Sequence, residues 1–180
     1  VRELVANKTV GDLHILKIQS RDPEPPSLEY VARSGGIFMD MSIHDFDMAR
    51  YITGSEVQEV YTVGATLINP KIKQYGDVDT AIITLKFTNG VIGVIDNSRQ
   101  AVYGYDQQLE AFGSEGSAKT NNEKETSVEI LDENGVKSDN PLHFFIERYK
   151  DSYIQEIRAF FTAIEENTEV SCDFLDGIMA

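Results

Sequence analysis

Cysteine and long apolar runs are scarce in this sequence of 180 residues. The one cysteine, Cys172, cannot form an internal disulfide, which fits a reducing compartment and predicts a cytoplasmic protein. No apolar run approaches the roughly 20 residues that a membrane helix needs, so an integral membrane protein is not expected. The opening segment has neither a basic n-region nor an apolar h-region, which is not the pattern of a signal peptide.

Basic residues are few relative to acidic ones: 16 Lys and Arg stand against 30 Asp and Glu, for a net charge of -14. A field of this sign repels nucleic acid and anionic membrane surfaces, so neither is an expected partner. Core-forming residues, in contrast, are plentiful, since 41% of the chain is apolar. That fraction suffices for one globular domain and excludes disordered and collagen-like chains.

The motifs of several common site chemistries are missing. There is no G-x-G-x-x-G or G-x-x-x-x-G-K-[ST] pattern for nucleotide phosphates, no H-E-x-x-H and no Cys-x-x-Cys. The three histidines are scattered and only one cysteine accompanies them, so a zinc site is not expected. We therefore expect neither cofactor-binding nor metal-binding residues within this chain.

The pattern of apolar residues predicts an α+β domain with a largely antiparallel open sheet and helices on one face. Helical periodicity marks a short opening helix, a helix from about Asp40 to Tyr51 that ends at Gly54, and a long helix after Asn140-Pro141. Alternation of period two marks the strands, at residues 14–20, 59–68, 80–87, 91–96, 107–112, 127–131 and after the turn at 133–135.

The strands at 59–68 and 80–87 predict two different sheet faces. One face is assigned to the side that the helices cover, and it carries Tyr61, Val63, Ala65, Leu67, Ala81, Ile83, Leu85 and Phe87. The other face is uncharged and too mixed to be a plain solvent face, and it carries Thr62, Thr66, Thr80, Thr84 and Ile82. We expect this second face to meet another subunit.

The densest polar constellation contains Asp40, His44 and Asp47. At positions i, i+4 and i+7 these residues lie on one face of a helix. A carboxylate one turn from an imidazole can orient its ring and raise its pKa, which suits a histidine that accepts and returns a proton near neutral pH. The alternative is a capping Asp at a helix start with an exposed His one turn on. Spacing alone favours that plainer alternative.

The context of the constellation changes this balance. The stretch SGGIFMDMSIHDFDMARYITG resembles the active-site helix of the glucose–fructose oxidoreductase / inositol dehydrogenase (Gfo/Idh/MocA) family, whose members carry G-G-x-x-x-D-x-x-x-H-D-x-D in their second domain. The resemblance covers nearly the whole chain. It includes the SRDPEPPSLEY loop, the DNSRQAVYGYDQQLEAFGSEG stretch and the closing helix RYKDSYIQEIRAFFTAI, and is greatest to the inositol 2-dehydrogenase subgroup.

This resemblance implies that residues 1–180 form a C-terminal substrate-binding and oligomerisation domain, with the N-terminal Rossmann domain outside the chain. NAD or NADP would be bound mainly by that missing domain, so the fragment by itself is expected to be inactive. By resemblance, His44 is the catalytic base that removes the hydroxyl proton of myo-inositol, and Asp40 is its orienting carboxylate. Asp47, Tyr103 and Arg21 are the candidate substrate-binding residues. The assembly implied is a homo-oligomer, a dimer or tetramer formed through the sheet.

Two alternatives remain open. One is a dehydrogenase of the same family that acts on another sugar or polyol, for which the motif helix would be unchanged. The other is a non-catalytic sugar-binding or assembly module that kept the fold, and the intact Asp40 and His44 argue against it.

Overall fold

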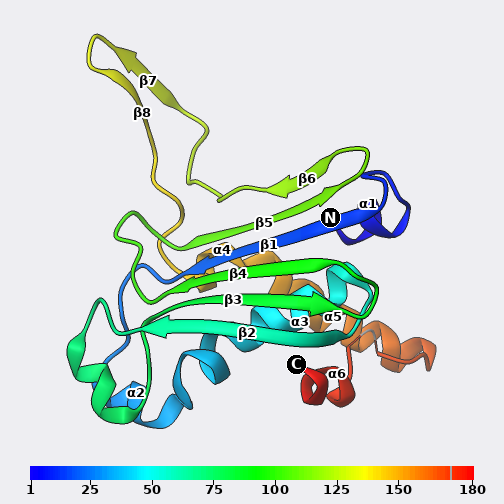
Figure 1. Cartoon of the computed structure of the whole chain (residues 1–180). Coiled ribbons are helices and arrows are strands. Elements are labelled where there is room, and N and C mark those ends of the chain that lie inside the picture. Colours follow the sequence, from blue (N-terminus) through cyan, green and yellow to red (C-terminus); the bar gives the residue numbers. More distant parts are fainter. Residues whose placement is uncertain (171) are drawn as a thin grey trace.

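The computed structural model describes residues 1–170 and 172–180, and its centre is a six-stranded sheet with helices on one side (Figure 1). The strand order is β2-β3-β4-β1-β5-β6. Only the β1–β4 pair is parallel, and the other four pairs are antiparallel. The predicted α+β class with a largely antiparallel sheet is confirmed. The strands are β1 Leu13–Arg21, β2 Val57–Ala65, β3 Thr80–Phe87, β4 Ile92–Ser98, β5 Asp106–Gly113 and β6 Ser117–Thr120.

One helical segment before β2 is irregular, and it matters for the site. A π-helical turn, Phe38–Ser42, leads directly into α3, which then ends at Gly54 in the left-handed conformation as predicted. No helix among the described residues is long and apolar enough to cross a membrane. The α-helices are α1 Arg2–Ala6, α2 Leu28–Ser34, α3 Ile43–Thr53, α4 Phe145–Arg148, α5 Lys150–Glu166 and α6 Phe174–Met179, and a 3-10 helix spans Pro70–Tyr75.

The core lies between the sheet and α3. Ala49 and Ile52 of α3 pack against alternate residues of the central strands, and the cluster also contains Leu16, Ile18, Ile83, Leu85, Phe87, Val91, Ile95 and Ala111. Because a strand alternates its side chains between faces, the residues between these core positions point to the opposite, open face of the sheet. This packing fixes α3 against the sheet and thereby positions its first turn.

The pairing of β2 with β3 corrects the predicted sheet faces. Tyr61 lies opposite Thr84 and Val63 lies opposite Ile82, so these two residues share the open face instead of the core. Their exposed fractions are 69% and 55%. Thr62, opposite the buried Ile83, is on the helix-covered side. A shift of one residue in the relative register exchanges the faces of a strand, which is why alternation alone did not decide this.

The region after β6 also differs from the prediction. The expected helix does not start at Asn140-Pro141, because Pro141 forms an isolated bridge with Lys124 and the Leu142 amide donates to the Glu123 carbonyl. Helical structure begins only at Phe145. Before it, the hairpin of β7 (Glu129–Asp132) and β8 (Gly135–Ser138) projects away from the sheet with every residue exposed (Figure 1).

Candidate active site

The segment that carries the predicted catalytic residues is held at its entry. Ser27 caps α2 by accepting a hydrogen bond from the Tyr30 amide. Gly35 and Gly36 follow α2 with φ angles of 84° and 83°, a conformation that side chains other than glycine rarely adopt. The Ile37 amide then donates to the Asp77 carboxylate at 2.9 Å. These contacts fix the entry into the π-helical turn that contains Asp40.

Asp40 is engaged by two partners through its two carboxylate oxygens. The Tyr30 hydroxyl donates to Oδ1 at 2.6 Å, and Arg99 donates to Oδ2 at 2.6 Å. Arg99 is buried, with only 5% of its side chain exposed, and it also pairs with Asp22 at 3.1 Å. Burial raises the pKa of Asp22, which the charge of Arg99 partly opposes. The result is a cluster in which one buried arginine lies between two half-buried carboxylates.

His44 lies in the first turn of α3 with its side chain exposed. In the part of the chain that the structure describes, no hydrogen bond joins His44 to Asp40, whose carboxylate is instead held by Tyr30 and Arg99. The predicted continuous helix from about Asp40 is interrupted here, because Asp40 belongs to the π turn and His44 to the α-helix. The i, i+4 stacking of an α-helix does not apply across a turn with i to i+5 hydrogen bonds.

A second polar cluster lies beneath His44, between α3 and the sheet. The Asn97 amide nitrogen donates to Asp45 Oδ2 at 2.7 Å, and the Ser42 hydroxyl donates to Asn97 Oδ1. Burial raises the pKa of Asp45 to about 6, although hydrogen bonds from Asn97 and Ser20 act in the opposite direction. The sequence prediction missed this cluster and Arg99. The sequence signal for both is the polar run of residues 96–99 at the end of a predicted strand.

The structure does not bring Arg21 and Tyr103 to the same site as Asp40. Arg21 alternates with Ser20 along β1 and lies on the open face, where it pairs with Asp96 and hydrogen-bonds the Tyr103 hydroxyl at 3.4 Å. Tyr103 also donates to Asp106. The two predicted substrate contacts thus form one charged network, but on the face of the sheet opposite to α3.

Tyr105 lies two residues after Tyr103 and has different neighbours. Its ring packs edge-on to Tyr149 with the centroids 6.0 Å apart. Burial, followed by the proximity of Tyr149 and the charges of Asp22 and Asp45, raises the pKa of Tyr105. Of the two tyrosines in the VYGYD segment, Tyr105 is therefore the one near the carboxylates of the α3 side.

Asp47, the third residue of the predicted constellation, is half-buried on α3. Burial, and then the negative charges of Asp176 and Asp47, raise the pKa of the Cys172 thiol. Asp47 therefore lies near the C-terminal segment that packs on α3. Within residues 1–170 and 172–180, no hydrogen bond joins Asp47 to Arg99 and its two carboxylates. None joins it to the polar cluster around Asn97 either.

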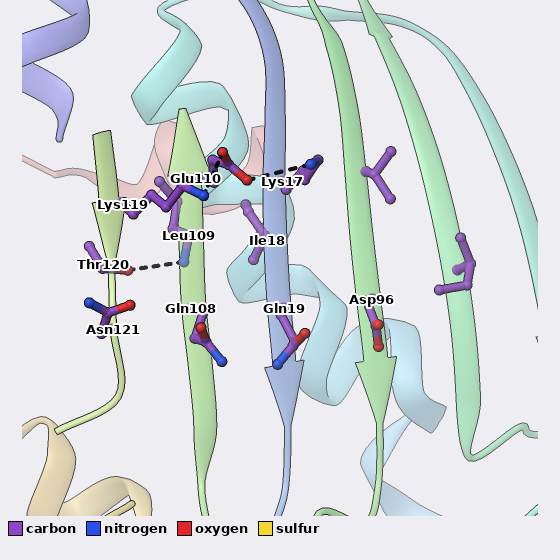
Figure 2. Close-up of a pocket in the computed structure, with 12 residues that line it drawn as sticks. Lys17, Ile18, Gln19, Asp96, Gln108, Leu109, Glu110, Lys119, Thr120 and Asn121 are labelled. Atoms are coloured by element: carbon purple, nitrogen blue, oxygen red, sulfur yellow. Dashed lines mark hydrogen bonds and ion pairs between the residues drawn. The ribbon is translucent and has the colours of Figure 1, made fainter. Parts of the chain in front are cut away.

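The open face contains a shallow hollow of about 310 Å³. Figure 2 shows Lys17, Gln19, Asp96 and Gln108 along its strands, with the helices behind the sheet. Glu110 pairs there with Lys17 at 3.4 Å and with Lys119 at 3.0 Å. The face that was predicted to be uncharged thus carries charges of both signs. Among the described residues, no group of three or more His, Cys, Asp or Glu is placed to hold a metal ion.

Comparison with protein families assigns most of the chain. Residues 1–119 match the family model described as GFO/IDH/MocA C-terminal domain. Over its full length the chain is 58% identical to an uncharacterized oxidoreductase, YrbE, of Bacillus subtilis, covering 53% of that protein. It is 51% identical to a myo-inositol 2-dehydrogenase of Thermotoga maritima, covering 54% of it. The chain thus spans about half the length of the curated relatives it matches.

Solved structures agree with this assignment. A probable dehydrogenase from Thermotoga maritima is 50% identical and superposes with a TM-score of 0.96, covering 99% of this chain and 54% of that one. A scyllo-inositol dehydrogenase from Lactobacillus casei, with bound cofactor NAD(H) and scyllo-inositol, is 28% identical with a TM-score of 0.88. The chain again covers 54% of that structure, and 99% of this chain is matched.

Proposed function

The chain belongs to the GFO/IDH/MocA family, and from that premise we propose that it is the C-terminal domain of an NAD(P)-dependent inositol 2-dehydrogenase. The observation that carries this proposal is the exposed His44 on a helix turn anchored beneath it to the sheet, next to a turn whose carboxylate, Asp40, is held by Arg99. Relatives and structural neighbours named as inositol dehydrogenases support the substrate class.

Oxidation of a ring hydroxyl to a ketone removes a hydride from carbon and a proton from oxygen, and only the proton is assigned to this chain. We assign this step to His44, because an exposed imidazole can act as a general base. Asp40 is fixed by Arg99 and Tyr30, so we assign it the role of an immobile carboxylate in the turn that precedes the base. Asp47 and Tyr105 are the proposed contacts to further hydroxyls. Arg21 and Tyr103 are left out of this set because they lie on the open face.

The nicotinamide cofactor is proposed to bind outside this chain. The glycine-rich turn at Gly35 and Gly36 leads into a helix, but the Ile37 amide there already donates to the Asp77 carboxylate. A pyrophosphate at this helix start would meet a negative charge instead of free amides, so these residues do not fit it. No step of the mechanism assigned to His44 depends on a cofactor contact within residues 1–180.

The test is oxidation of polyols by the full-length protein. We expect NADH or NADPH formation with myo-inositol or scyllo-inositol at a kcat/KM at least about tenfold above that for unrelated sugars. A strong preference for a non-inositol sugar would favour the alternative dehydrogenase of the same family. Binding of polyols without turnover would favour the non-catalytic module. We also propose a cytoplasmic location, because the single Cys172 leaves no internal disulfide that needs an oxidising compartment.

We further propose that the open face of the sheet joins two copies of the protein. Its apolar part is formed by residues that are 44% to 69% exposed: Tyr61, Val63, Ile82, Ile92 and Phe112. Exposed apolar residues that lie among charged ones are typical of interfaces, and the hollow in this face is also lined by Lys17, Glu110 and Lys119. A specific interface would bury at least about 1,200 Å² in total.

A further inference from the structure

Asn97, at the end of β4, contacts two residues of the segment that carries His44. Its amide nitrogen donates to Asp45 Oδ2 at 2.7 Å, and its amide oxygen accepts from the Ser42 hydroxyl. Ser42 and Asn97 are fully buried, and Asp45 is 5% exposed. We call these three residues the Asn97 clamp.

The clamp spans the junction between two kinds of helix. Ser42 is the last residue of the π turn, and Asp45 lies in the first turn of α3. His44 lies between the two anchors in sequence, with its side chain directed to solvent. A single side chain from the sheet therefore holds both sides of the turn that presents the proposed base.

This placement has a specific mechanical consequence. A π turn contains one residue more than the α-helical turn it replaces, and it is intrinsically the less stable of the two. If it relaxed to an α-helix, His44 would rotate by about 100° about the helix axis relative to the residues before the turn, since an α-helix has 3.6 residues per turn. Anchoring Ser42 and Asp45 to one amide opposes that relaxation.

We propose that Asn97 is a positioning residue, which fixes the direction of His44 through its hydrogen bonds to Ser42 and Asp45. This inference rests on the proposed role of His44 as the base. It also explains why a buried polar group stands next to an apolar core formed by residues such as Ala49 and Ile95. An apolar side chain at position 97 would stabilise the fold about as well as Asn97 does, because a buried polar pair contributes little net free energy of folding.

Asp45 supports the same interpretation. Burial raises its pKa to about 6, so ionisation of this carboxyl costs more free energy in the folded protein than in the unfolded chain. The Asn97 amide nitrogen donates to that carboxylate, and its amide oxygen accepts a hydrogen bond from the Ser42 hydroxyl. A costly buried carboxylate that accepts a hydrogen bond from the residue that also holds Ser42 is more consistent with positioning than with a simple contribution to the core.

The first test replaces Asn97 with Ala in the full-length enzyme. We expect kcat to fall at least about tenfold, because small displacements of a catalytic group are costly. The KM for NAD should stay within about twofold, since the cofactor is bound elsewhere. Asn89→Ala is the matched control: Asn89 hydrogen-bonds the Val91 amide at the far end of the β3–β4 hairpin. It should lower the melting temperature without lowering kcat per folded protein.

The second test exchanges the two partners. Asn97→Asp alone places two carboxylates together and should also lower kcat at least about tenfold. The double variant Asp45→Asn/Asn97→Asp restores one amide and one carboxylate, with an acceptor left for the Ser42 hydroxyl. We expect it to recover at least about fivefold in kcat over Asn97→Asp. Should Asn97→Ala not fold, this pair of variants decides the question.

Two results would overturn the proposal. One is an Asn97→Ala enzyme that keeps more than half of the wild-type kcat. The other is a double variant that regains the wild-type melting temperature but not kcat. If the wild-type protein oxidises no polyol, the proposed function fails, and the clamp is judged from crystal structures instead. His44 should then leave its wild-type direction in Asn97→Ala and keep it in the double variant, and an unmoved His44 in Asn97→Ala rejects the clamp.

Discussion

The guanidinium of Arg99 lies 2.6 Å from Oδ2 of Asp40, although the two residues are 59 positions apart in the sequence. The carboxylate that was expected to orient His44 forms an ion pair with this buried arginine. Because Arg99 also pairs with Asp22, the arginine is the common partner of two acidic side chains. This cluster joins the end of β4 to the π turn and to the loop after β1.

Removal of Arg99 should be strongly destabilising. Arg99→Met leaves Asp22 and Asp40 without their common positive partner, and breaking a buried pair from one side typically costs about 3–5 kcal/mol. We expect the melting temperature of the full-length protein to fall by roughly 5–15 °C, measured by scanning calorimetry or fluorimetry. Arg33→Met is the control, because Arg33 pairs with Glu29 on the surface and such pairs contribute about 0–1 kcal/mol. Equal effects of the two variants would contradict the role of Arg99.

Replacement of His44 should affect turnover and not cofactor binding. General-base catalysis contributes typically 10²–10⁴-fold, so His44→Ala is expected to lower kcat for inositol oxidation by at least about 10²-fold. The Kd for NAD, measured by titration calorimetry, should stay within about twofold because the cofactor is proposed to bind to another part of the protein. An His44→Ala enzyme that retains more than about a tenth of wild-type kcat would remove His44 from the base role.

Asp45 should make stability depend on pH with a defined sign. Its pKa is raised from 3.8 to about 6, so the folded state binds the proton more tightly than the unfolded state. The folded protein therefore loses stability as the pH rises from about 4 to about 6, by up to about 3 kcal/mol from this group. The Asp45→Asn variant has no carboxyl group at this position, so it does not lose this stability as the pH rises. The melting temperature of Asp45→Asn relative to wild type should be higher at pH 7.5 than at pH 4.

An exposed aspartate provides the control for this pH series. Its hydrogen bond and charge interaction with Lys8 lower the pKa of Asp12, which is the opposite direction. Asp12→Asn should therefore be relatively less stable at pH 7.5 than at pH 4, by a small amount because both side chains are exposed. If the Asp45→Asn difference does not change with pH, Asp45 does not titrate in this window.

A charge placed on the open face should prevent self-association. Ile82, on β3, is 44% exposed on that face and lines the same hollow as Val94. Ile82→Asp is expected to convert the full-length protein to a smaller species in sedimentation velocity at tens of micromolar, because a buried unpaired charge strongly disfavours an interface. Leu4→Lys, at an exposed position of α1, should leave the assembly unchanged. A monomeric wild-type protein would contradict the proposed interface.

The sequence by itself determined the features that depend on local spacing. Alternation marked β1, β3, β4 and β5, the Asn89-Gly90 pair marked the hairpin between β3 and β4, and Gly54 marked the end of α3. Each of these signals depends on residues within a few positions of one another. The family motif around Asp40 and His44 was likewise contained in a single short stretch, and the match of the family model to residues 1–119 agrees with it.

Only the tertiary structure decided which side chains face one another. The register of β2 against β3 placed Tyr61 and Val63 on the open face, since a strand pattern of period two has no preferred partner until pairing is known. Alternation along β1 sent Ser20 and Arg21 to opposite faces, which separated Arg21 from the α3 side. The partners of Asp40 and Asp45, Arg99 and Asn97, come from β4 and the residue after it. Contacts between residues more than 50 positions apart depend on strand order and sheet packing, which residue spacing in the sequence does not encode.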